Sequence, residues 1–128
     1  MGLDMYLYKI NKESPETILN GIEVAYWRKA NQIRKWFVDH TSYDEDDNCS
    51  QAIVFKEDLE QLVEDCRQVL EDHSLADSIL PTRSGFFFGS CEYDDWYFSQ
   101  LEDTIETIEN ILQTTDWENE QIVYSDWW

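Results

Sequence analysis

The chain has 128 residues, 28 acidic and nine basic, and its formal net charge of −19 repels bare nucleic acid and anionic membranes but attracts cationic surfaces. With 42% hydrophobic and 15% aromatic residues it is not a disordered acidic tail, and its length predicts a single folded domain over residues 1–128. No apolar run approaches the roughly 18 residues of a membrane span, so we expect no membrane association through a helix.

The first half of the chain predicts two strands and one helix. Apolar and polar side chains alternate over residues 3–8, which is the pattern of a half-buried strand. Over residues 22–40 the apolar side chains recur at a helical period, and four of the nine basic residues lie in this predicted helix: Arg28, Lys29, Arg34 and Lys35. The apolar, β-prone residues 52–55 predict a second strand.

The second half predicts two helices and two more strands. One helix has Glu57 and Asp58 in its first turn, where carboxylates favour the positive end of the helix dipole. Residues 85–89 are apolar on both faces and predict a central strand. Asp94 or Asp95 caps a third helix that reaches about residue 115, and residues 121–124 predict a last strand.

The order of these elements is β-α-β-α-β-α-β, with neither an internal repeat nor a dividing linker. This order favours an α+β fold, in which a small mixed sheet of about four strands packs with three helices.

Acidic side chains gather in one loop and along two of the predicted helices. Residues four apart on a helix rise ~6 Å, a spacing similar in scale to that of neighbouring phosphates along a nucleic-acid strand. We therefore expect a surface that imitates nucleic acid and binds a cationic groove; the alternative is a solvated face that only keeps the chain soluble. The candidate partner-binding residues are Asp44, Glu45, Asp46, Asp47, Glu60, Glu64, Asp65, Glu102, Glu106 and Glu109.

Two other binding modes stay open. Trp27, Arg28, Arg34 and Lys35 combine an aromatic ring with cations, so they form a candidate pocket for an anionic small molecule such as a nucleotide. In the alternative, Trp27 packs under another element and Arg28 and Lys35 pair with nearby acids. The adjacent Trp127 and Trp128 could instead anchor a partner or a second copy.

Metal and catalytic motifs are weak. In the acidic loop, Asp44, Asp46 and Asn48 match the first ligands of a calcium-binding EF-hand, but Cys49 and Phe55 occupy its required Gly and Glu positions. No spacing of His and Cys suggests a zinc site, although Cys66 and His73 are expected on one side of a helix. There is no phosphate-binding loop or nucleophile with a base, so we expect neither a metal, a cofactor nor an enzyme.

Three cysteines, Cys49, Cys66 and Cys91, form no CxxC pair. With no secretory signal ahead of them, an odd number of cysteines is typical of free thiols in a reducing cytoplasm.

Four segments resemble a family of small, uncharacterised bacteriophage and prophage proteins. They are the opening MGLDMYL, EVAYWRKANQI at residues 23–33, SGFFFGS at residues 84–90 and TDWE at residues 115–118. The resemblance implies a phage-encoded protein that acts inside the bacterial host cell, and it supplies no catalytic residues. By analogy with other small acidic phage proteins, we expect an inhibitor of host defence, of the anti-CRISPR or anti-restriction kind.

Overall fold

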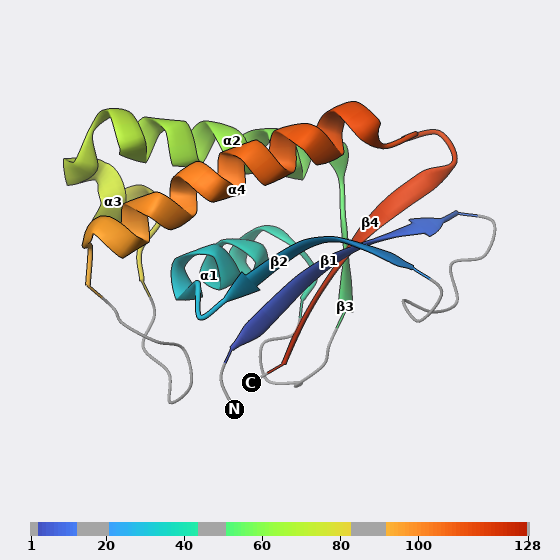
Figure 1. Cartoon of the computed structure of the whole chain (residues 1–128), viewed down its shortest axis with the longest axis horizontal. Coiled ribbons are helices and arrows are strands. Elements are labelled where there is room, and N and C mark those ends of the chain that lie inside the picture. The colour runs from blue at the N-terminus through green and yellow to red at the C-terminus, as the bar shows by residue number, and fades with distance from the viewer. Residues whose placement is uncertain (1–2, 13–20, 44–50, 83–91, 128) are drawn as a thin grey trace.

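The computed structural model describes residues 3–12, 21–43, 51–82 and 92–127, and these form one four-stranded sheet with helices on one side (Figure 1). The elements in chain order are β1 (Asp4–Asn11), β2 (Ile22–Arg28), α1 (Asn31–His40), β3 (Gln51–Val54), α2 (Lys56–Glu71), a 3-10 turn (His73–Leu75), α3 (Ala76–Ile79), α4 (Asp95–Thr114) and β4 (Glu120–Trp127).

The α+β class and a sheet of about four strands are confirmed, but the expected mixture of strand directions is wrong. The strand order is β2-β1-β4-β3, and every pair is antiparallel. The reason lies in the connections: the chain leaves β3 along α2, returns along α4, and so enters β4 from the end of the sheet at which β3 finished (Figure 1). Such an out-and-back pair of helices forces neighbouring strands to run in opposite directions.

The predicted helix over residues 22–40 is also corrected, because its first part is the strand β2. Ile22–Arg28 pairs with β1 along its whole length, with a register shift beside Leu7 and Tyr8. In this segment Ala25 and Trp27 are buried and Tyr26 is exposed, which is the alternation of a strand. Sheet pairing therefore outweighs the apparent helical period, and α1 starts only at Asn31.

The remaining predicted elements lie close to their observed positions. The predicted helices beginning near Glu57 and Asp95 are α2 and α4, and the Asp94 carboxylate accepts a hydrogen bond from the Tyr97 N–H at 3.0 Å. The strands predicted at residues 52–55 and 121–124 are β3 and β4. The strand predicted at residues 85–89 lies outside the described residues.

The core lies between the sheet and its helices. Side chains that share a face through the strand register, such as Met5 and Leu7 in β1 and Ile122 and Tyr124 in β4, are all fully buried. Helix α1 joins this core through Phe37, whose ring stacks on that of Tyr124 with centroids 4.3 Å apart. Burying each such side chain contributes roughly 1.5–3 kcal/mol, so this face fixes where α2 and α4 lie.

Candidate functional sites

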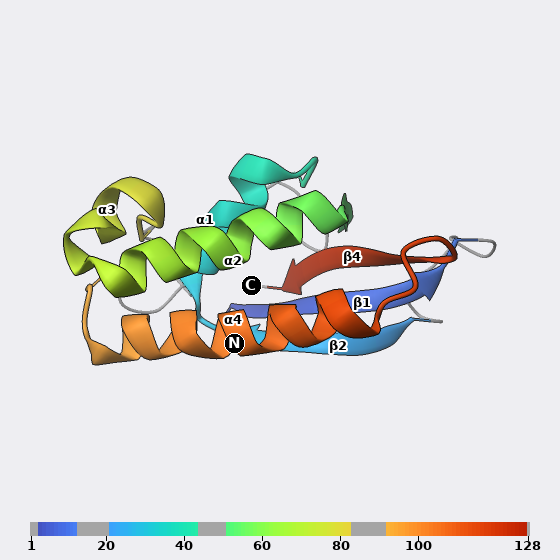
Figure 2. The same ribbon diagram turned by 90° about the horizontal axis from the view of Figure 1, so that it is seen from above.

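The first candidate site is the outer surface of α2 and α4, which run side by side along the same face of the sheet (Figures 1 and 2). Helix α2 has six acidic and two basic residues, and α4 has five acidic residues and no basic one. The two helices thus carry a formal net charge of −9, about half of the charge of the whole chain.

Acidic residues of both helices lie on the flanks at which α2 and α4 meet. At 100° per residue, Glu60 and Glu64 lie on the same flank of α2 as Arg67, and Glu102 and Glu106 lie on the same flank of α4 as Glu109. Arg67 and Glu109 form an ion pair between the helices, so this is the flank on which they meet. We call these two rows, Glu60 and Glu64 with Glu102, Glu106 and Glu109, the acidic seam.

Most of the acidic seam is exposed. Glu60, Glu64, Glu102 and Glu106 are exposed, and Glu109 is half-buried. Among the described residues, Arg67 supplies the cation that bridges the rows, and no basic side chain pairs with Glu60, Glu102 or Glu106. Glu60, Glu102 and Glu106 are therefore exposed to solvent without a cationic partner among the described residues.

Two groups of the predicted partner-binding residues do not belong to the seam. Asp65 lies on the opposite flank of α2, where it accepts hydrogen bonds from the Trp36 indole N–H and the Gln61 amide, each at 2.8 Å. Its role is thus to hold α1 against α2. The loop from Asp44 to Asp47 lies outside the described residues.

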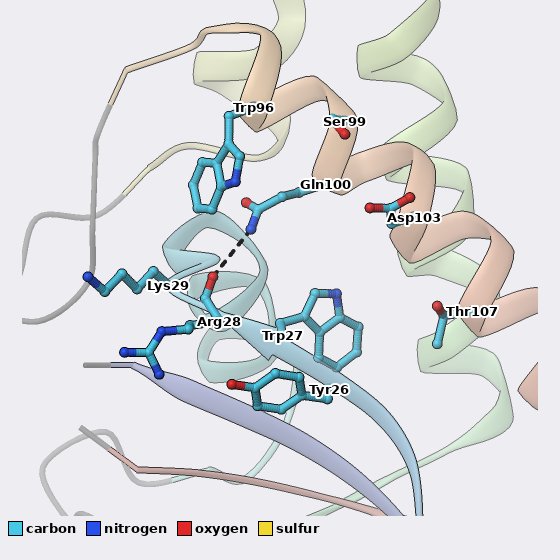
Figure 3. Close-up of a pocket in the computed structure, with 9 residues that line it drawn as sticks. All are labelled: Tyr26, Trp27, Arg28, Lys29, Trp96, Ser99, Gln100, Asp103 and Thr107. Carbon is cyan, nitrogen blue, oxygen red and sulfur yellow. Dashed lines mark hydrogen bonds between the residues drawn. The ribbon is translucent and has the colours of Figure 1, made fainter. Parts of the chain in front are cut away.

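The second candidate site is a groove of about 460 Å³ between β2 and the start of α4 (Figure 3). The residues that line it are Tyr26, Trp27, Arg28, Lys29, Trp96, Ser99, Gln100, Asp103 and Thr107. Trp27 and Arg28 thus meet at a real hollow, as the sequence suggested, but the other half of the site comes from α4.

Arg34 and Lys35 do not reach this groove. The Arg34 guanidinium is buried, and its Nε lies 2.9 Å from the Asp126 carboxylate in β4. The Lys35 ammonium pairs with Asp39, one turn further along α1, at 2.6 Å. The predicted basic cluster is therefore divided, because Trp27 and Arg28 belong to a strand and the other two to a helix.

Sequence reasoning missed the contribution of α4, although a signal was present. Trp96, Ser99, Gln100, Asp103 and Thr107 recur at spacings of three and four residues, so they form one stripe beside the buried stripe of the helix. This stripe lies on the flank away from the acidic seam. Polar residues and a tryptophan in a stripe next to the core are the pattern that could have pointed to a groove.

Hydrogen bonds fix the walls of the groove. The Trp27 indole N–H donates to the Thr104 hydroxyl at 2.9 Å and holds the ring against α4. The Gln100 amide donates to the Arg28 carbonyl at 3.4 Å (Figure 3) and accepts from the Gln32 amide at 2.9 Å. The groove is thus tied across three elements.

One end of the groove carries a polar cluster. The Tyr26 hydroxyl and the Arg28 guanidinium both donate to the Asp4 carboxylate, at 2.6 and 2.8 Å. The hydrogen bond to Asp4, followed by burial, raises the pKa of Tyr26 above its ordinary value, so the hydroxyl stays protonated at neutral pH and remains a donor.

A smaller hollow of about 220 Å³ lies where β3 passes into α2 and where β4 begins. Phe55 and Trp117 line it with Lys12 and Lys56. The Lys12 ammonium donates to the Trp117 carbonyl at 2.6 Å. This cation therefore already holds the end of β1 against the turn that precedes β4.

The described residues offer no metal centre. No three His, Cys, Asp or Glu side chains among them are grouped to hold an ion. The expectation that His73 and Cys66 share one side of a helix is wrong: His73 is exposed in the 3-10 turn and stacks on Phe98 with centroids 3.7 Å apart. Cys66 is buried and free, and its burial, with a smaller effect of Asp65, raises the pKa of its thiol to about 12.

Of the terminal tryptophans, Trp127 is 55% exposed at the end of β4, and Trp128 lies outside the described residues. Among the helices of the described residues, none is both long and apolar enough to cross a membrane. No protein-family model matches the chain, and no curated protein or solved structure is significantly similar to it.

Proposed function

We propose that this protein binds the cationic nucleic-acid-binding surface of another protein through the acidic seam, and thereby excludes nucleic acid from that surface. The partner class is a host defence nuclease or a CRISPR effector in a phage-infected bacterium, a setting that follows from the resemblance of the four sequence segments. The protein acts by binding, without a reaction of its own.

The observation that carries this proposal is the run of exposed carboxylates along the adjoining flanks of α2 and α4. Helices α2 and α4 run in opposite directions (Figure 1), so from the Arg67–Glu109 ion pair the carboxylates of each helix extend toward the N-terminus of that helix. Exposed negative charge therefore follows the outer surface of the helix pair in both directions from this point. A groove lined by Lys and Arg releases its counterions on binding such a surface much as it does on binding phosphates.

The two helices also hold the rows rigidly. Leu59 and Leu62 in α2 and Leu101 and Ile108 in α4 are fully buried, so the helices cannot separate without exposing the core. A pre-ordered charge pattern loses little conformational freedom on binding, which favours affinity.

The test is competition between the protein and DNA for a purified partner. A basic protein retained on the immobilised chain at low salt would be purified, and its binding to fluorescein-labelled duplex DNA followed by anisotropy. We expect the wild-type chain to displace the DNA at 50 mM NaCl and to do so more weakly at 300 mM, because salt screens the attraction.

Two charge-matched variants locate the surface. Glu102→Lys with Glu106→Lys should weaken displacement about tenfold, from roughly 0.5–1 kcal/mol for each reversed rim charge. Glu23→Lys with Glu118→Lys changes the net charge equally at exposed positions away from the seam, and should leave displacement nearly unchanged. An equal loss in both variants would mean that only net charge matters, and failure of the wild type to displace DNA would refute the decoy function.

A further inference from the structure

We propose that the groove between β2 and α4 binds a nucleoside monophosphate, with the base against Trp96 and the phosphate at the end formed by Arg28 and Lys29 (Figure 3). This site is independent of the acidic seam, because it uses the other flank of α4. The chain would thus join a small-molecule site to a protein-binding surface through one helix.

The size of the groove suits a small ligand. Its volume of about 460 Å³ falls within the roughly 300–1,000 Å³ that small-molecule sites occupy. Its floor is the buried Trp27 ring, held by Thr104, so the hollow is preformed and does not depend on a surface side chain moving aside.

Two aromatic rings beside the hollow are exposed. Trp96 is 43% exposed and Tyr26 is 49% exposed, and within the described residues no other ring stacks on Trp96. An exposed indole offers a face on which a base can stack, a contact worth roughly 1–3 kcal/mol per base and available to every base.

The cations at one end of the groove mark the position of an anion. Arg28 uses one guanidinium nitrogen on Asp4, and the Lys29 ammonium has no acidic partner among the described residues. In a chain with a net charge of −19, the Lys29 ammonium is thus a cation at the mouth of the hollow that is left available for an anionic ligand. The field of the whole chain still opposes multiply charged anions, which favours a monophosphate over a triphosphate.

The backbone of Lys29 points to the same end of the groove. Its φ of 57° places a non-glycine residue in the left-handed region, and its N–H donates to the Leu3 carbonyl at 2.6 Å. Strain of this kind concentrates at binding sites. Glycine would adopt this turn without strain, yet the position holds a lysine, whose charge lies at the end of the groove.

The α4 side of the groove supplies groups for the sugar and the base. Asp103 and Ser99 have no hydrogen-bond partner among the described residues, and both line the hollow. A carboxylate accepts hydrogen bonds from ribose hydroxyls or from an exocyclic amine and repels a second anionic group. This arrangement orients a ligand that is anionic at one end and a hydrogen-bond donor at the other.

Isothermal titration calorimetry with AMP, GMP, CMP and UMP tests the proposal. We expect at least one monophosphate to bind, and its dissociation constant to rise at least tenfold in Trp96→Ala and in Lys29→Gly. The matching nucleoside (adenosine for AMP, guanosine for GMP, cytidine for CMP, uridine for UMP) lacks the anion, and inorganic phosphate lacks the ring. Each should therefore bind at least tenfold more weakly than the monophosphate that binds. Indole-3-acetate separates a nucleotide site from a site for any aromatic anion.

Matched controls exclude general effects of the substitutions. Trp127→Ala removes an exposed tryptophan at the end of β4, and Lys56→Ala removes a cation outside the groove; both should bind the nucleotide as the wild type does. No binding at 10 mM of any monophosphate, equal binding of phosphate or indole-3-acetate, or an equal loss in Trp127→Ala would overturn the proposal. DNA displacement by Trp96→Ala should stay intact, so failure here is distinguishable from failure of the decoy function.

Discussion

At the scale of single residues, the most constrained group is the Asp126 carboxylate in the core. It accepts hydrogen bonds from Arg34 at 2.9 Å, from the Tyr124 hydroxyl at 2.6 Å and from the Tyr43 hydroxyl. Burial and the neighbouring carboxylate raise the pKa values of both tyrosines, so both hydroxyls remain donors. Every partner of this buried charge therefore comes from the chain itself, which ties α1 and the segment after it to β4.

We expect Asp126→Asn to destabilise the protein by about 3–5 kcal/mol, because it removes the buried carboxylate that pairs with Arg34 and accepts from two tyrosine hydroxyls. Urea unfolding monitored by tryptophan fluorescence measures the loss. Tyr43→Phe removes one hydrogen bond and keeps the ion pair, and should cost only about 1–3 kcal/mol. Equal effects of the two substitutions would mean that the ion pair contributes nothing beyond its hydrogen bonds.

At the scale of elements, the turn between β2 and α1 decides the local fold. Strand β2 ends at Arg28, the next residue Lys29 has a positive φ, and α1 begins two residues later at Asn31. The sequence here satisfies a helical period and a strand period at once, since Tyr26 and Ala30 are four apart and Ala25 and Trp27 are two apart. The hydrogen-bonded pairing with β1, a contact that the local sequence does not reveal, selects the strand.

Lys29→Gly should stabilise the protein by about 0.5–1 kcal/mol, because glycine adopts the left-handed region freely while the unfolded chain gains some entropy. Lys29→Ala keeps the strained backbone and removes the same charge, so it should give no such gain. Thermal unfolding of both variants by circular dichroism makes the comparison. Equal stability of the two variants would show that the turn is not strained.

At the scale of the whole molecule, the charge of −19 and the exposed carboxylates of the acidic seam produce electrostatic repulsion. Ion pairs such as Arg67 with Glu109 and Arg28 with Asp4 offset only part of it. The fold tolerates this repulsion because its core, from Leu3 to Tyr124, is continuous across the sheet and the helices. The net charge therefore lowers the stability of the fold, by an amount that depends on the salt concentration.

Raising NaCl from 10 to 300 mM should increase the melting temperature by several degrees, because the Debye length falls from about 30 Å to below 10 Å and screens the repulsion. Differential scanning calorimetry measures the shift. In Glu102→Lys with Glu106→Lys the increase should be smaller, since the two reversed charges already lower the net negative charge. A melting temperature that falls with salt would mean that attractive surface pairs dominate.

The sequence by itself determined the α+β class, α2 and α4 and the strands β1, β3 and β4, because each has a local period or cap that no other element alters. It also placed Glu60, Glu64, Glu102 and Glu106 on exposed flanks, since helical spacing alone decides which side a residue occupies. The sequence also indicated that Trp27 and Arg28 could bind a ligand together, but it placed both residues in a helix, whereas they lie in a strand.

Only the tertiary structure decided the rest. Whether two acidic flanks converge depends on which sides of α2 and α4 meet, and that is set by the packing of both helices on the sheet. The groove needs β2 beside a stripe of α4 about 70 residues later, and the direction of β4 follows from the helices that precede it. These features are relations between distant segments, and the burial of the shared core fixes them.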